Sequence, residues 1–170
     1  MNKLFWLIYI QPLHRIMIFM ILAAVLWGYL GNREQGSRRW RILNAAVFAG
    51  IAAVIFYMTV CARGEGTAEA VLVPFQSFRE AREQPELYRS MLMNVLLFFP
   101  IGLSLPFVLG KWKLSVPVTV VLACLFSAGI EYLQYHYSLG RCEVDDVIMN
   151  TLGALLGCSA RWISHSWKRK

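Results

Sequence analysis

The 170-residue chain is 58% hydrophobic and only 16% charged, and its mean hydropathy is +0.50. This composition excludes an ordinary soluble domain and is typical of an integral membrane protein. The net charge of +7 comes from Lys and Arg residues that lie between apolar runs and at the C-terminus, not in one basic stripe. They are better explained as topology signals and contacts with anionic lipids than as a nucleic-acid-binding face.

The first apolar runs predict two membrane-spanning helices. Residues 4–30 are too few for two spans, so we expect one helix over about 13–30, preceded by an interfacial segment rich in Trp and Tyr. A signal peptide is the rival, and it is disfavoured because no small-residue cleavage site follows. A loop with four arginines (32–41) precedes the second expected span, about 42–62, whose small residues suit close helix packing.

The longest polar segment, about 63–90, is close to charge balance and therefore has little orienting force. Within it, residues 71–78 (VLVPFQSF) are apolar and aromatic. Two readings remain open: a segment that lies at the membrane interface or folds back over the bundle, and a half-buried strand.

Three further apolar runs predict spans over about 91–109, 114–135 and 144–163. Pro100 and Pro106 in the first of these predict a kink, because proline removes a backbone donor and clashes with the preceding turn. Five spans place all the basic loops in the cytoplasm only if the N-terminus is outside and the C-terminus is cytoplasmic. The sequence thus predicts an all-α, polytopic transmembrane helical bundle of about five spans, a single domain over 1–170, located in the cell membrane.

The stretch 131–157 concentrates ionisable residues at the margins of two apolar runs. Such groups are costly in lipid, and they usually face a bundle interior or a wet cavity and indicate a functional site. On helical spacing Glu131 and Gln134 share one face, whereas Asp146 and Asn150 begin a second stripe. The two glycines of the GALLG segment continue this stripe and predict close helix packing. We therefore expect a helical hairpin whose polar faces meet near its turn, in the outer half of the membrane.

The four cysteines give no metal motif, because none has CxxC spacing and two fall inside apolar runs. We expect no metal site and treat all four as small buried hydrophobes. A disulfide between Cys61 and Cys142, both near the expected outer face, is the weaker alternative.

Four motifs follow one another along the C-terminal part of the chain. They are VPFQSF (73–78), NVLLFFPIGLSLP (94–106), GIEYLQ (129–134) and GRCEVDDVIMNTLGALLG (140–157). In this order they resemble the VanZ-like family of membrane proteins, named for a teicoplanin resistance factor. The motif-bearing part is about 71–163, and the first 60 residues contain no matching motif. The resemblance implies an envelope protein that lowers susceptibility to lipid-bearing glycopeptides, without an agreed mechanism.

Two functions remain open for the polar residues. An enzyme acting on a lipid-linked or anionic envelope substrate at the outer leaflet would use Arg141 to clamp the anion, and Glu131, Asp145 or Asp146 as general base. A non-catalytic protein would instead bind a lipoglycopeptide or modulate another envelope protein. No HExxH, GxSxG or P-loop motif decides between them. The predicted ligand-binding residues are Asn94, Glu131, Gln134, Arg141, Asp146 and Asn150.

A purely structural interpretation competes with both functions. Arg141 would pair with one of the adjacent aspartates and join the hairpin, and an aspartate at the helix start would cap its own helix. Glu131 would be neutral and hydrogen-bonded across helices to Asn94 or Asn150. Membrane lipids are the expected partners and nucleic acid is not, while ligand identity, cofactors and oligomeric state do not follow from the sequence.

Overall fold

The structure, a computed structural model, describes residues 11–34, 36–64, 66, 68–84, 86–110 and 113–166, with only the backbone described at 11–14 and 165. The expected aromatic segment before the first helix, apart from its last residues, and the basic tail at 168–170 lie outside this part of the chain.

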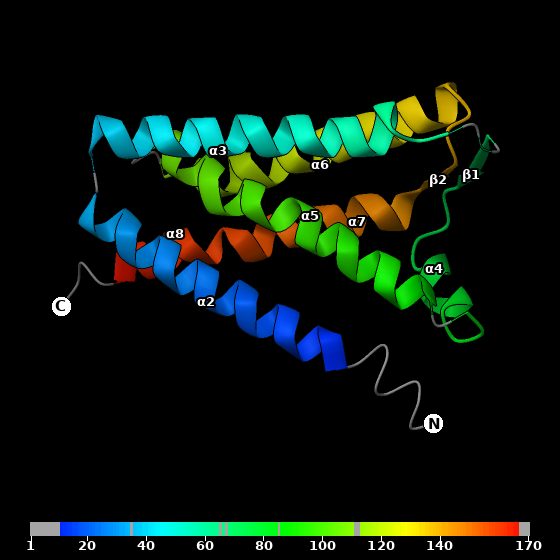
Figure 1. Ribbon diagram of the computed structural model, residues 1–170, viewed down its shortest axis with the longest axis horizontal. Coiled ribbons are helices and arrows are strands. Elements are labelled where there is room, and N and C mark those ends of the chain that lie inside the picture. The colour runs from blue at the N-terminus through cyan, green and yellow to red at the C-terminus, as the bar shows by residue number, and fades with distance from the viewer. Residues whose placement is uncertain are drawn as a thin grey trace.

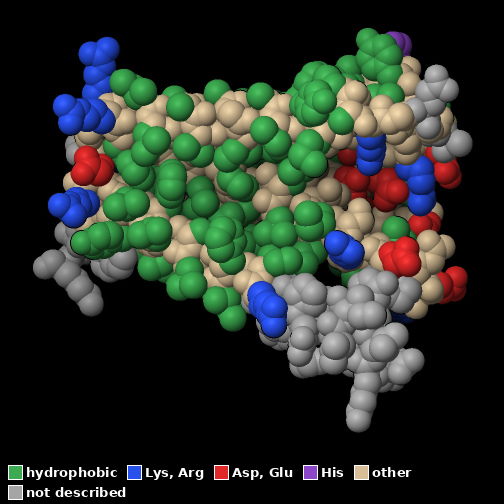
Figure 2. Space-filling model, viewed as in Figure 1, with side chains coloured by type: hydrophobic (Ala, Val, Ile, Leu, Met, Phe, Trp, Pro, Cys, Tyr) green, Lys and Arg blue, Asp and Glu red, His purple; other side chains and the backbone are tan. Residues whose placement is uncertain are grey.

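Among the described residues, four helices are long and apolar enough to cross a membrane. They are α2 (Gln11–Arg33), α3 (Arg38–Phe56, continued by the π-helical η2, Tyr57–Cys61), α5 (Glu86–Val108) and α6 (Ser115–His136). Their bounds agree within a few residues with the first four predicted spans, and the predicted helical membrane bundle is confirmed. The helices run lengthwise through the molecule (Figure 1), and an apolar band separates charged side chains at the two ends (Figure 2).

The expected fifth helix is not continuous. The run at 144–163 forms α7 (Val144–Gly157) and α8 (Ser159–Ser166), which follow one another along the bundle (Figure 1). The break falls at Cys158, where the chain changes partner, because α7 packs mainly on α5 and α6, and α8 mainly on α2. Small residues allow both approaches: a Cβ on Gly157 would overlap the Phe99 carbonyl oxygen, and one on Gly28 would lie 2.7 Å from the Ala160 carbonyl oxygen.

The central helix α5 runs through Pro100 and Pro106 without interruption. Ser104 donates a hydrogen bond to the Pro100 carbonyl oxygen (2.9 Å). Helix α5 contributes side chains to both hydrophobic clusters of the core, and its Phe98 and Ile101 are almost completely buried. The bend expected at Pro100 stays a prediction.

Glycines bring α5 and α7 into backbone contact, as the GALLG segment predicted. A Cβ added to Gly153 would overlap the carbonyl oxygen of Val95, and one added to Gly102 would overlap that of Ala154. Such close approach is typical of membrane helices that pair through small residues. It fixes α7, and the polar residues at its start, against α5.

Two short strands and a short helix complete the fold at one end of the bundle. β1 (Glu69–Val71) pairs in parallel with β2 (Arg141–Glu143), so that Glu69 lies opposite Arg141 and Val71 opposite Glu143. The segment after β1 turns back over the bundle and forms α4 (Gln76–Glu80). Of the two readings of residues 71–78, the structure agrees with the segment that folds back over the bundle, and the strand reading applies only to Val71, where β1 ends.

Candidate functional site

The polar residues of the predicted hairpin lie at the end of the bundle where β1, β2 and α4 cover the starts of α5 and α7 (Figure 1). We call this end the carboxylate end. Red acidic and blue basic side chains mix there in the space-filling view (Figure 2).

Asp145 connects α7 to the segment that leads into α4. Its side chain is 1% exposed, and its carboxylate oxygens accept hydrogen bonds from the backbone N–H groups of Phe75 (2.6 Å) and Ser77 (2.7 Å). Phe75 has φ 62°, a left-handed conformation that is uncommon outside glycine. The carboxylate therefore holds this turn and caps α4, whereas the structural interpretation expected an aspartate to cap its own helix.

Further hydrogen bonds join α4, β2 and α6. The Ser77 hydroxyl donates to the Glu143 carboxylate (2.8 Å), and the Glu143 backbone N–H donates to the Glu131 carboxylate (3.0 Å). Glu131 is 5% exposed. It is thus bonded to the start of its hairpin partner, and the expected bond to Asn94 or Asn150 is not formed.

Arg141 pairs with glutamates and not with the aspartates of α7. Its Nε lies 3.5 Å from carboxylate oxygens of Glu69 and Glu143, and its Nη2 lies 3.5 Å from one of Glu80. The predicted pairing with Asp145 or Asp146 is therefore wrong. Three carboxylates around one guanidinium leave no excess positive charge for an anionic ligand.

A pocket of about 300 Å³ opens beside this network. Asp146 lies on its wall, where the Asn94 amide approaches its carboxylate and no backbone N–H of the described residues donates to it. Asn94 lies next to Asp146, and its amide nitrogen is buried without a well-formed hydrogen bond. The pocket is lined by Arg63, Ser77, Leu87, Ser90, Met91, Arg141, Glu143 and Asp146.

Only Arg141 and Asp146 of the six predicted ligand-binding residues line this pocket, and two of the other four bond to neighbouring helices. The Gln134 amide donates to the Thr59 carbonyl oxygen (3.0 Å), and the Asn150 amide donates to the Ser127 hydroxyl (2.8 Å). Both bonds join neighbouring helices, which is a common role of buried amides in membrane bundles. A ligand role for either residue stays a prediction.

Comparison with known proteins gives the family. The sequence model of the VanZ/LLP1 family matches residues 45–164, well over half of the chain. The chain belongs to the VanZ/LLP1 family. Protein VanZ of Enterococcus faecium is 31% identical over 78 residues, which cover 46% of this chain and 47% of that protein. The aligned region thus spans about half of the relative's length, and no solved structure matches.

The VanZ/LLP1 match places the whole carboxylate end inside the shared region. The matched region begins within α3, earlier than the motifs found by inspection, and ends within α8. The resemblance inferred from the four ordered motifs is confirmed. The match excludes α2 and the turn between α2 and α3.

Several residues at the carboxylate end had no role predicted from the sequence. The segment that contains Arg63, Glu69 and Glu80 was considered only for its overall charge balance. Ser77 was considered only as part of the VPFQSF motif. The near-equal numbers of opposite charges were the available signal, because balanced charges in a folded segment are often paired. Arg63 is the second cation of the site and lies within electrostatic range of Glu131 and Asp146.

The chemistry of the site favours a ligand that donates hydrogen bonds. The network contains two cations, Arg63 and Arg141, against six carboxylates: Glu69, Glu80, Glu131, Glu143, Asp145 and Asp146. Carboxylates accept hydrogen bonds and attract cations, so hydroxyl, amide or ammonium groups fit better than phosphate. In the part of the chain that the structure describes, no three His, Cys, Asp or Glu side chains form a metal-binding group.

Cys142 is the one thiol near the pocket. Burial raises the pKa of this thiol, and the neighbouring carboxylates of Glu131, Asp146 and Glu143 raise it further. It is therefore a protonated thiol at neutral pH and a weak nucleophile. Both Cys142 and the exposed Cys61 are free cysteines, so the weaker alternative of a disulfide between them is not what the structure has.

Proposed function

We propose that this VanZ/LLP1 protein is a multi-pass protein of the cell membrane that lowers susceptibility to lipid-bearing glycopeptides of the teicoplanin type. We further propose that the pocket at the carboxylate end faces the outside and binds its ligand without turnover. The family supports the first part, since resemblance to it implies such resistance. The observation that supports the second part is Asp146, whose carboxylate lies on the pocket wall beside Asn94 and accepts no backbone N–H of the described residues.

The bonding of the other carboxylates favours binding over catalysis. Asp145 and Glu131 are engaged by backbone amides, and Arg141 is engaged by glutamates. Of the three candidate bases only Asp146 lines the pocket, and no backbone N–H of the described residues donates to its carboxylate. An enzymatic alternative would therefore use Asp146 as its general base, on a substrate without an anionic group at this site.

Replacing Asp146 with asparagine tests the pocket. We expect Asp146→Asn to abolish protection against a lipoglycopeptide, because the amide carries no negative charge and replaces one of the two acceptor oxygens with an NH₂ donor. The unfolding free energy should change by less than about 1 kcal/mol, since no recorded backbone bond is lost. The measurement is the minimal inhibitory concentration in a host lacking the gene, at matched protein levels and with melting temperatures of the purified variants.

Glu83→Gln is the matched control for this experiment, because Glu83 is an exposed acidic residue between α4 and α5 that does not line the pocket. It removes one negative charge from the same end of the bundle and should keep full protection. A stable Asp146→Asn variant that protects as well as Glu83→Gln would rule out the pocket as the site of action.

The orientation in the membrane can be tested with thiol labelling. The end opposite the pocket is rich in arginine and should be cytoplasmic by the positive-inside rule, so exposed Cys61 should lie outside. In a variant with Cys61 as its sole cysteine, a membrane-impermeant maleimide should label intact cells. A sole cysteine in place of exposed Arg39, at the opposite end, should react only after permeabilisation. The reverse pattern would invert the proposed orientation.

A further inference from the structure

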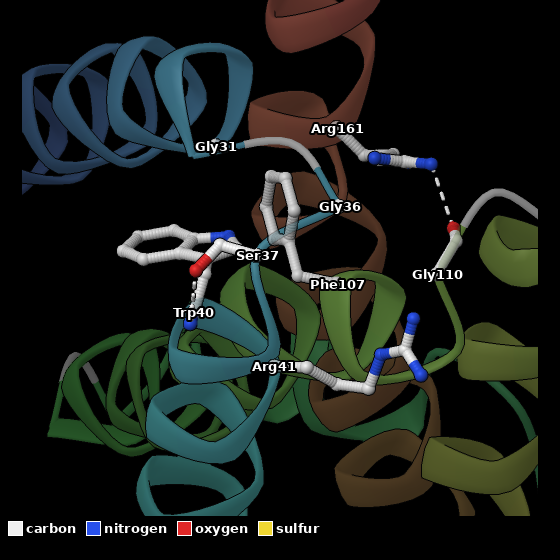
Figure 3. Close-up of a pocket in the computed structure, with 8 residues that line it drawn as sticks. All are labelled: Gly31, Gly36, Ser37, Trp40, Arg41, Phe107, Gly110 and Arg161. Carbon is white, nitrogen blue, oxygen red and sulfur yellow. Dashed lines mark hydrogen bonds between the residues drawn. The ribbon is translucent and has the colours of Figure 1, made fainter.

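A second cavity of about 300 Å³ lies at the opposite end of the bundle (Figure 3). We call it the basic-end cavity. It is enclosed by the end of α2, the start of α3, the end of α5 and α8, and its volume is in the range of small-molecule sites. The pocket at the carboxylate end does not extend to it, and the proposed function does not use it.

Two arginines converge on this cavity. Arg161 Nη2 donates a hydrogen bond to the Gly110 carbonyl oxygen (2.6 Å), and its guanidinium lies 5.3 Å from the centre of the Phe107 ring. A Cβ placed on Gly110 would lie 3.8 Å from Arg41 Nη2, so both guanidinium groups reach the same turn (Figure 3). In the described part of the chain, neither arginine forms an ion pair with a carboxylate.

Trp40 adds a buried donor with no acceptor. Its side chain is 8% exposed, and its indole nitrogen has no hydrogen-bond partner among the described residues. The ring packs edge-on against Phe107 (5.8 Å between centroids), and the nitrogen edge is turned toward that side chain in the cavity (Figure 3). A buried N–H without an acceptor is unfavourable and rare, so a ligand that supplies the acceptor would explain it.

The backbone reinforces this positive character. Ser37 begins α3 at the cavity wall, and its hydroxyl accepts the Trp40 backbone N–H (3.4 Å). The amino end of a long helix carries a partial positive charge that favours anions. Two guanidinium groups, an indole N–H and a helix amino end are all donors, which suits a group rich in acceptors.

We propose that the basic-end cavity binds a phosphate group, supplied by the head-group of an anionic phospholipid or by free phosphate. The planar guanidinium groups of Arg41 and Arg161 would each bind phosphate oxygens through paired N–H groups, and Trp40 would donate to a third oxygen. Contact between Arg161 and the Phe107 ring holds one guanidinium in place before the ligand arrives.

The test uses the full-length protein, purified in a mild uncharged detergent. The probes are inorganic phosphate, short-chain phosphatidic acid and the matching diacylglycerol, which lacks the phosphate. Binding is measured by native mass spectrometry and by tryptophan fluorescence. Saturable binding of both phosphate-bearing probes would mean that the phosphate group alone suffices. Binding of phosphatidic acid alone would identify a lipid head-group, and either result supports the proposal.

The variants are Arg41→Gln and Trp40→Phe, with Arg39→Gln as the matched control because Arg39 is exposed on the same helix but does not line the cavity. Arg41→Gln should raise the Kd about tenfold, since it removes a charge-assisted bond. Trp40→Phe keeps the ring and should raise the Kd about fivefold through loss of one neutral bond. Arg39→Gln should change the Kd less than about twofold.

Three results would overturn the proposal: no saturable binding of either phosphate-bearing probe, diacylglycerol binding as tight as phosphatidic acid, or equal effects of Arg41→Gln and Arg39→Gln. Melting temperatures measured without ligand confirm that each variant is folded. Since Arg41 is exposed and has no recorded ion pair, its replacement should leave the melting temperature unchanged.

Discussion

An asparagine in place of Asp145 should destabilise the protein far more than the same change at the adjacent Asp146. The Asp145 carboxylate accepts two buried backbone N–H groups, at Phe75 and Ser77, whereas an asparagine amide offers one acceptor and turns an NH₂ group toward the other donor. Each buried donor left without its acceptor costs about 1–3 kcal/mol, and the lost bonds are charge-assisted, so we expect a loss of roughly 2–5 kcal/mol.

The measurement is thermal unfolding of the two purified variants in the same detergent, with the amount of membrane-inserted protein as a second readout. Asp146→Asn is the control, because it changes the same chemical group one residue away without removing a hydrogen bond from a backbone N–H. Equal melting temperatures for the two variants would mean that Asp145 does not hold the turn before α4.

Replacing Gly153 with alanine should lower the free energy of unfolding by a similar amount, but for a different reason. Gly153→Ala places a Cβ against the carbonyl oxygen of Val95, so α7 must move away from α5. Overpacking of this kind costs typically about 1–3 kcal/mol and more when backbone blocks the added atom, and Gly153→Val should prevent folding. Unfolding temperature and size-exclusion profile in detergent are the measurements.

Gly129→Ala is the matched control, since Gly129 lies inside α6 and a Cβ there meets no atom within 4 Å. Alanine is the better helix former by about 0.5–1 kcal/mol, so this variant should be as stable as the natural protein or slightly more so. If both alanine variants unfolded at the same temperature, the close contact between α5 and α7 would not contribute to stability.

The helices could be predicted because a membrane imposes a length on each apolar run. The first four spans follow from this rule, and the GALLG segment predicted close packing of α7 without indicating α5 as its partner. The break at Cys158 could not be predicted, because the residues around it are compatible with a helix. It results from a change of packing partner, from α5 to α2, which no local pattern records.

The sequence predicted several residues of the candidate site, but it did not predict which residues they bond to. Asn94, Glu131 and Asp146 are polar residues in apolar sequence, and the structure brings them to one end of the bundle. The partners of Arg141 depend on pairing between β1 and β2, two three-residue strands far apart in the chain. Strands of that length have too few residues to show alternation, so Glu69 and Glu80 gave no local sign of their role.

The two ends of the bundle have separate sequence origins. The carboxylate end lies wholly within residues 45–164, the region matched by the VanZ/LLP1 family, whereas the basic-end cavity is built where that region meets the preceding helix. Trp40 and Arg41 come from outside the match, and Phe107 and Arg161 come from inside it. A family member with other residues before position 45 would therefore keep the pocket at the carboxylate end and lose Trp40 and Arg41 from the basic-end cavity, so the two cavities can change independently during evolution.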